Sequence, residues 1–214
     1  MHETSTRTLL ACGVAATPLF FAVAAAQIAT RPDFDLGPHM ISQLSAGDHG
    51  WIQMVNFVVT GALFVLAAVG LRRTVTEGPG RTWLPRLVGV FGVGLVAAGL
   101  FVADPANGYP VGAAEGTTWH GVLHGVAAMA SGLALVAATL VAARRSVAQG
   151  RKGLAALHVA IGLVYLGLPA GDPDRMGLLF AVASLIAWSW VSVTAGRLMT
   201  VSQPQVAAPH LQHA

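Results

Sequence analysis

Apolar runs of about 20 residues, separated by short polar segments, recur along the whole chain. A helix of about 20 residues rises roughly 30 Å, which is the thickness of the hydrocarbon core of a bilayer. The pattern therefore predicts an all-α integral membrane bundle of six transmembrane helices in a single domain. The predicted spans are residues 8–28, 51–71, 87–103, 119–143, 153–169 and 177–198.

The two ends of the chain need separate interpretation. The first run ends in small residues, Val23-Ala24-Ala25-Ala26-Gln27, which resemble a signal-peptidase site. However, the run is longer than the apolar core of about 7–15 residues that a signal peptide carries. We therefore expect a retained first span. Residues 199–214 contain two prolines and no apolar run of spanning length, which predicts a disordered cytoplasmic tail.

Basic residues are concentrated on one side of the predicted bundle. If the amino terminus is cytoplasmic, only Arg31 and Arg175 of the 12 basic residues lie outside. The positive-inside rule then predicts that both termini are cytoplasmic. Seven of the nine acidic residues lie on the opposite side. An extracytoplasmic site would explain this, and so would the need of any soluble loop for some charge.

The composition excludes other classes. A hydrophobic fraction of 55% and a charged fraction of 10% leave too few charges for the surface of a soluble domain. The net charge of +3 does not indicate a nucleic-acid partner, because the basic residues form short clusters between spans. Cys12 is the single cysteine, so there is no Cys-pair metal motif. The one lysine and the many Ala, Gly and Val residues indicate a bacterial origin, and hence the inner membrane.

Two histidines stand four residues apart at the outer end of the fourth predicted span. His120 and His124 share one helix face, and such a pair can hold a zinc ion if a third ligand is added. Candidates for that ligand are His39, His49, Asp48 and Asp104. The alternative is that His120 is an interfacial residue beside Trp119 and that His124 hydrogen-bonds a neighbouring helix.

Other polar residues point to the same side of the membrane. Asp104 follows the third span, where it is a ligand, a general base or a helix-end residue, and Ser42 follows His39 by three residues. We take Asp104 and Ser42 as candidate catalytic residues. A serine one heptad below His124, Ser131, continues the face of the histidine pair.

The second span carries a polar stripe formed by Gln53, Asn56 and Thr60. Polar residues at membrane depth usually turn toward the bundle interior. We therefore expect the stripe to face the His120–His124 face and, with Ser131, to line a ligand site. Hydrogen bonding between helices without a ligand is the alternative.

Two further groups within the spans are interpreted as packing. Ser184, Trp188 and Ser192 share one face of the last span, which predicts helix packing. His158 lies within the fifth span on the cytoplasmic side, far from the outer cluster, and is interpreted as a core histidine.

Several motifs occur together in order: Arg31-Pro-Asp-Phe-Asp-Leu, Ser42-Gln-Leu-Ser-Ala-Gly-Asp-His-Gly-Trp, Phe101-Val-Ala-Asp-Pro, Gly108-Tyr-Pro and Trp119-His-Gly-Val-Leu-His-Gly. Over residues 8–198 the chain resembles the family of domain of unknown function nine-nine-eight. The resemblance implies a six-helix integral membrane protein and no particular activity. It also implies that Ser42, Asp104 and His124 are recurrent polar positions of the family, His120 less so.

A looser similarity of residue types exists to alkaline ceramidases and adiponectin-receptor-like proteins, which are membrane hydrolases with zinc held by three histidines. His39, His120 and His124 with Ser42 and Asp104 would supply the same types. Those proteins have seven spans and carry their His-x-x-x-His pair in the last one, so the similarity is an analogy.

Three classes of function are therefore left open. The first is an uncharacterised polytopic membrane protein whose outer His/Asp/Ser cluster has a structural or partner-binding role. The second is a zinc-dependent hydrolase of a lipid amide or ester, in which the metal activates a water. The third is a carrier of a small solute or of protons, with His124 and Asp104 as relay. The expected partners are the lipid bilayer and a lipid or small molecule at the outer face.

Overall fold

The computed structural model describes residues 2–201. In this part of the chain there is no strand, and six long helices account for most of the residues. They are α1 (His2–Thr30), α2 (Gly50–Thr74), α3 (Trp83–Leu100), α4 (Trp119–Ala148), α5 (Lys152–Gly167) and α6 (Met176–Val201). Short 3₁₀ turns lie at η1 (Ile41–Ser45), η2 (Leu168–Ala170) and η3 (Pro173–Arg175). All six long helices are long and apolar enough to cross a membrane, which confirms the predicted all-α, six-span class.

The helix bounds differ from the predicted spans mainly at α1, α3 and α4, and α1 begins six residues before the predicted residue 8. Helix α3 begins four residues earlier than the predicted 87 because Pro85 is compatible with a first helical turn. It ends at Leu100, before the Asp104-Pro105 pair. Helix α4 continues past the predicted 143 through two arginines to Ala148. Of the predicted disordered tail, residues 199–201 continue α6, and residues 202–214 lie outside the described residues.

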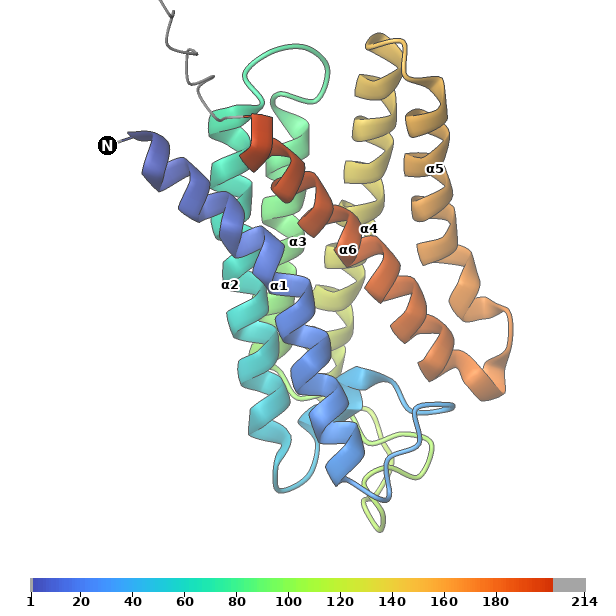
Figure 1. Ribbon diagram of the computed structural model, residues 1–214. Helices are drawn as coiled ribbons and strands as arrows, with labels where there is room; N and C mark the ends of the chain where they lie inside the picture. Colours follow the sequence, from blue (N-terminus) through green and yellow to red (C-terminus); the bar gives the residue numbers. More distant parts are fainter. Residues whose placement is uncertain (1, 202–214) are drawn as a thin grey trace, which may run out of the picture.

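The helices pack in sequence order, each against the next, and α6 packs back against α1 (Figure 1). The six helices therefore form a closed ring, and α6 runs obliquely to the other helices of that ring. At the centre, the indole of Trp188 on α6 contacts aromatic rings of three other helices. Its ring centroid lies 4.6 Å from that of Phe20, 5.4 Å from that of Phe91 and 6.1 Å from that of Phe64.

Helices α2 and α3 pack closely where two glycines face each other. A Cβ placed on Gly92 would lie 2.7 Å from the carbonyl oxygen of Gly61, so only glycine permits this approach of the two backbones. Small residues at an interface are the usual means by which membrane helices reach such contact.

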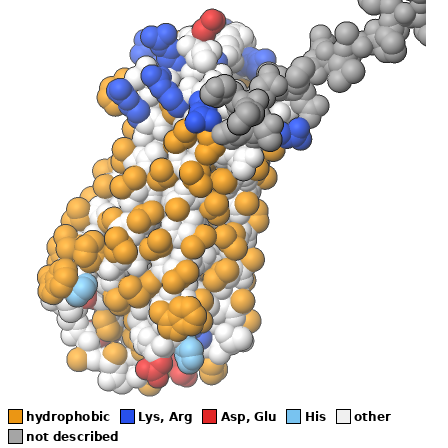
Figure 2. All heavy atoms as spheres, turned by 90° about the vertical axis from the view of Figure 1, so that its left-hand side faces the viewer, with side chains coloured by type: hydrophobic (Ala, Val, Ile, Leu, Met, Phe, Trp, Pro, Cys, Tyr) orange, Lys and Arg blue, Asp and Glu red, His pale blue; other side chains and the backbone are white. Residues whose placement is uncertain are grey.

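Charge is segregated along the bundle axis. Figure 2 shows a cluster of Lys and Arg side chains at one end, where an acidic side chain also lies, most of the Asp, Glu and His side chains at the other, and a broad hydrophobic surface between the two ends. The N-terminal end of α1 and the C-terminal end of α6 lie at the basic end of the bundle (Figure 1). At that end Arg145 donates hydrogen bonds of 2.6 Å and 3.0 Å to the carbonyl oxygens of Glu77 and Pro79. These bonds fasten the α2–α3 connection onto α4.

At the acidic end the two long connections, residues 31–49 and 101–118, form one structure that we call the cap. Gln43 donates from Nε2 to the carbonyl oxygen of Ala106 at 2.6 Å. Asn107 donates from Nδ2 to the carbonyl oxygen of Pro38 at 3.1 Å. Because each connection satisfies polar groups of the other, neither can take this conformation alone.

One arginine joins the cap to the helices. Arg31 donates from Nη1 to the carbonyl oxygen of Leu44 at 2.7 Å and to the Tyr109 hydroxyl at 3.2 Å. From Nη2 it donates at 2.8 Å to the side-chain oxygen of Gln27 and at 2.8 Å to the carbonyl oxygen of His49. A single planar guanidinium thus links α1, both cap segments and the start of α2.

Candidate functional site

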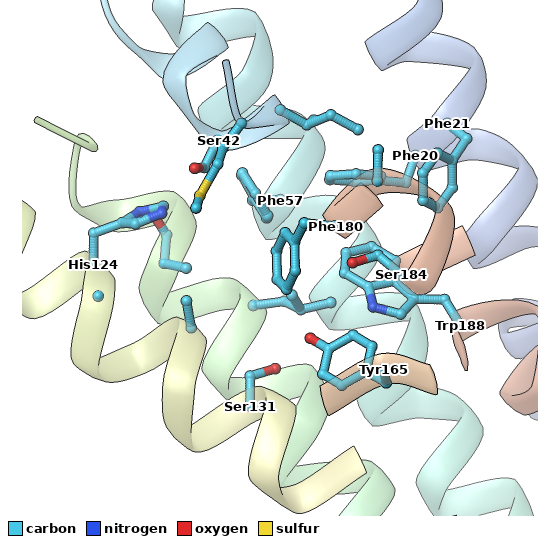
Figure 3. A pocket seen from close by; sticks show the side chains of 17 residues that line it. Phe20, Phe21, Ser42, Phe57, His124, Ser131, Tyr165, Phe180, Ser184 and Trp188 are labelled. Carbon is cyan, nitrogen blue, oxygen red and sulfur yellow. The ribbon is translucent and has the colours of Figure 1, made fainter. Parts of the chain in front are cut away.

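A cavity of about 200 Å³ lies inside the ring, in the half of the bundle nearer the cap (Figure 3). All six helices and the η1 segment contribute to its wall, which is mainly aromatic and aliphatic. The polar or partly polar side chains in the wall are those of Ser42, His124, Ser131, Tyr165, Ser184 and Trp188. A mainly apolar cavity with a few polar groups is the usual form of a small-molecule site in a protein.

His124 is held in one tautomer by the end of α3. Its Nδ1 lies 2.8 Å from the carbonyl oxygen of Ala98 and 3.0 Å from that of Phe101. Carbonyl oxygens only accept, so Nδ1 carries the hydrogen, and Nε2 of the neutral ring is an acceptor. The last carbonyls of a helix lack partners within it, which explains why α3 needs this donor. His124 is buried and lines the cavity, and within residues 2–201 no hydrogen bond occupies Nε2.

Two serines line the cavity in different ways. Ser131 is buried and donates to the carbonyl oxygen of Phe91 at 2.8 Å, so its hydroxyl joins α4 to α3. Ser42 is half-buried in η1, at the cap side of the cavity, on the same side as His124 in Figure 3. The η1 turn is fixed at its start by Gln43, whose side-chain oxygen accepts from the backbone N–H of Met40 at 2.7 Å.

The wall opposite His124 comes from α5 and α6, where Tyr165, Ser184 and Trp188 lie together (Figure 3). Tyr165 packs against α4 at Gly132, where a Cβ would lie 3.0 Å from the tyrosine ring. Trp188 Nε1 is buried and has no hydrogen-bond partner in the described part of the chain. The sequence interpretation of Ser184 and Trp188 as packing is incomplete, because they also line the cavity. The repeat of Phe180, Ser184 and Trp188 on one helix face was the signal available.

The predicted zinc ligands do not come together. His39 uses both ring nitrogens: Nδ1 accepts from the backbone N–H of Asp35, and Nε2 donates to the carbonyl oxygen of Asn107, each at 3.0 Å. His120 stacks on Trp119 with ring centroids 3.5 Å apart. Among residues 2–201 no group of three or more His, Cys, Asp or Glu side chains is placed to hold a metal ion. The donors of His39, His120 and His124 therefore do not fit a zinc site.

Asp104 lies at the start of α4 and is not part of the cavity wall. Its carboxylate accepts from the Thr118 hydroxyl at 2.6 Å and from the Thr118 backbone N–H at 3.1 Å. The Thr118 hydroxyl in turn accepts from the backbone N–H of Gly121 at 3.1 Å. A carboxylate beside a helix N-terminus is favoured by the helix dipole. Of the roles considered for Asp104, this geometry is that of a helix-end residue, but at the start of α4 and not at the end of the third span.

The polar stripe of α2 is buried, as expected, but it faces α1. Gln27 donates from Nε2 to the side-chain oxygen of Gln53 at 2.7 Å, and Asn56 donates from Nδ2 to the carbonyl oxygen of Phe20 at 3.0 Å. The expectation that the stripe faces His120 and His124 is therefore wrong. In the ring order α2 lies between α1 and α3, so α4 is not its neighbour. Gln53, Asn56 and Thr60 do not line the cavity; Ser131 does.

His158 is a core histidine, as expected: it is buried, and its Nδ1 accepts from Trp190 Nε1 at 2.8 Å.

Six apolar helices closed into a ring around this cavity define a polytopic membrane protein. More particularly, the chain belongs to the family described as Protein of unknown function (DUF998), whose model matches residues 14–197. This match confirms the resemblance carried by the sequence motifs. A search of curated proteins and a search of solved structures each give no match.

Proposed function

We propose that this protein binds one small, mainly apolar molecule, or the apolar part of an amphipathic one, in the cavity between its six helices. The observation that carries the proposal is the cavity wall itself. Aromatic and aliphatic side chains from every helix surround a space that His124 also lines, and Nε2 of His124 has no hydrogen-bond partner among residues 2–201. A ligand hydroxyl or amide N–H is the group that such an acceptor recognises.

The segregated charge supports an orientation for this site. With the basic end cytoplasmic, as the positive-inside rule requires, both termini are cytoplasmic and the cap is extracytoplasmic. The cavity then lies in the outer half of the membrane, beneath the cap. A bacterial inner membrane is the location that this orientation and the composition favour.

The size of the cavity limits the ligand. A cavity of about 150 Å³ holds a benzene molecule, so about 200 Å³ holds a ring or a short stretch of acyl chain. A whole phospholipid does not fit. Gly125 lines the cavity and is exposed, and a Cβ there would meet no atom within 4 Å. We infer that the cavity opens to the bilayer beside Gly125, so that the rest of a longer ligand can stay among the lipids.

The test is to fill the cavity and measure what remains bound. Ala128 lines the cavity, so Ala128→Phe places a ring in the space, whereas Val126 on the same helix is 56% exposed and Val126→Phe changes only the lipid-facing surface. Protein purified in mild detergent would be analysed by native mass spectrometry and by extraction of bound molecules. A small apolar compound present with the wild type and Val126→Phe but lost with Ala128→Phe is the expected result. Equal content in all three proteins would overturn the proposal.

A second candidate function is hydrolysis of a bound ester, because Ser42 and His124 border the same side of the cavity (Figure 3). The Ser42 oxygen would bond to the ester carbonyl carbon while its proton passes to His124 Nε2. The alcohol would leave with that proton, and water would then release the acid and restore the serine. In this reaction the carbonyl oxygens of Ala98 and Phe101, and not the carboxylate of Asp104, would orient the imidazole.

A fluorophosphonate probe, which labels activated serines, separates the two functions. Labelling of the wild type that is lost in Ser42→Ala and in His124→Asn would establish the hydrolase. Absence of labelling in a folded wild type that still retains an apolar compound would leave binding as the function of the cavity.

A further inference from the structure

A second concave feature lies on the outside of the bundle, at the opposite end from the cap. It is a groove of about 400 Å³ between α2 and α3. Its walls are apolar, and its basic rim is formed by Arg72 and Arg73 at the end of α2 and Arg86 near the start of α3. No acidic side chain lines it.

The groove exists because small residues face each other there. A Cβ on Gly89 would lie 3.6 Å from the Cβ of Ala68, so the position has room for a side chain that the sequence does not supply. Val69 and Val93, which border this space, are 41% and 58% exposed. In a membrane these side chains face lipid, so the groove opens onto acyl chains rather than onto water.

The antiparallel arrangement brings the arginines to one level. Helix α2 ends at Thr74 and α3 begins at Trp83, so the last turn of one helix lies beside the first turn of the other. Arg72 donates to the carbonyl oxygen of Arg81 at 3.3 Å, and the guanidinium carbon of Arg86 lies 5.7 Å from the ring centroid of Trp83. A tryptophan at this level marks the interface between hydrocarbon and head groups. The basic rim therefore lies at the depth of lipid phosphates.

We propose that this groove is a specific site for an anionic phospholipid. The phosphate lies among the guanidinium groups of Arg72, Arg73 and Arg86, and one acyl chain occupies the channel over Gly89 and Ala68. Arginine matches phosphate geometry with paired N–H donors, and basic pockets between membrane helices on the cytoplasmic side are suited to anionic head groups. This site is separate from the cavity beneath the cap and does not depend on its function.

The experiment measures lipid preference by native mass spectrometry. The protein in mild detergent would be titrated with phosphatidylglycerol and with zwitterionic phosphatidylethanolamine of the same chain length. The wild type is expected to bind phosphatidylglycerol more tightly than phosphatidylethanolamine at one site. The single variants Arg72→Gln, Arg73→Gln and Arg86→Gln are each expected to lower this preference for phosphatidylglycerol roughly fivefold. The matched controls are the single variants Arg144→Gln, Arg151→Gln and Lys152→Gln, each of which removes one exposed charge at the same end but outside the groove.

A second pair of variants tests the acyl channel. Gly89→Leu fills the groove, whereas Val90→Leu enlarges a side chain that is 50% exposed and lies outside it. Loss of the tight site in Gly89→Leu but not in Val90→Leu is expected. An equal effect of the three control variants at Arg144, Arg151 and Lys152, or a preference that survives Gly89→Leu and is abolished by excess inorganic phosphate, would overturn the proposal. The first result would mean general surface charge, and the second a phosphate site without a lipid chain.

Discussion

The imidazole Nδ1 of His124 on α4 donates to the carbonyl oxygen of Ala98 on α3 at 2.8 Å. This bond satisfies a carbonyl that the end of α3 leaves without a partner, and it also fixes which ring nitrogen can meet a ligand. The same residue therefore has a structural role through one nitrogen and a proposed binding role through the other. The two roles can be separated by substitution.

The first prediction is that His124→Ala and His124→Asn differ in stability but not in ligand content. Asn places an N–H donor near the position of Nδ1, whereas Ala leaves buried carbonyl oxygens without a donor, at a cost of about 1–3 kcal/mol. Thermal unfolding in detergent should therefore show a large loss for Ala and a smaller one for Asn. Both variants lack Nε2, so both should lose the bound compound. Retention of the compound by His124→Asn would contradict the proposed role of Nε2.

A second prediction concerns the link between the cap and the helices. Arg31→Lys keeps the charge but cannot reach four acceptors on three segments, so we expect a loss of about 2–4 kcal/mol in unfolding free energy. Hydrogen exchange should show the loss as faster exchange in residues 31–49 and 101–118. Arg175→Lys is the control, because its ion pair with Asp172 is exposed and such pairs contribute at most about 1 kcal/mol. Equal exchange in the two variants would mean that Arg31 does not hold the cap.

Replacing each of two buried threonines by valine should change the stability of the protein differently. Thr17 Oγ1 lies 2.8 Å from Ser192 Oγ and joins α1 to α6, whereas Thr60 Oγ1 is buried without a partner among the described residues. Thr17→Val breaks a buried pair and should destabilise the protein by about 1–2 kcal/mol. Thr60→Val removes an unsatisfied group at nearly constant volume and should be neutral or stabilising. Thermal unfolding of both variants in one detergent is the measurement, and marked destabilisation by Thr60→Val would show that its hydroxyl has a partner such as bound water.

The close contact of α2 with α3 predicts that adding one methyl group at Gly92 strongly lowers the stability of the protein. Gly92→Ala would place a Cβ against the Gly61 carbonyl and should cost about 1–3 kcal/mol, because overpacking forces the backbones apart. Gly153→Ala in α5 meets no atom within 4 Å and should be neutral or slightly stabilising through helix propensity. Unfolding midpoints that do not separate the two variants would rule out this close approach.

Cysteine labelling tests the orientation. In a Cys12→Ala background, Gly116→Cys lies in the cap and Gln149→Cys follows α4 at the basic end, and both positions are exposed. A maleimide that cannot cross membranes should modify Gly116→Cys in intact cells and Gln149→Cys only after permeabilisation. The reverse pattern would place the termini outside.

The sequence by itself determined the number of spans, the fold class, the family and the charge segregation. Each of these depends on local properties: the length of an apolar run, the residues at its ends, and motifs read in order. It also indicated Ser42, Ser131 and His124, all of which line the cavity.

The tertiary structure alone decided which side chains meet. The stripe of Gln53, Asn56 and Thr60 had to face inward, but only the ring order made α1 its partner. The sequence makes His39 a candidate metal ligand, but in the folded cap both of its ring nitrogens are hydrogen-bonded. Tyr165 of α5 and Trp188 of α6 are cavity residues because these two helices close the ring between α4 and α1. The physical reason is that hydrophobicity drives every helix into the bilayer alike, whereas the packing of small residues and the pairing of buried polar groups select each helix's neighbours.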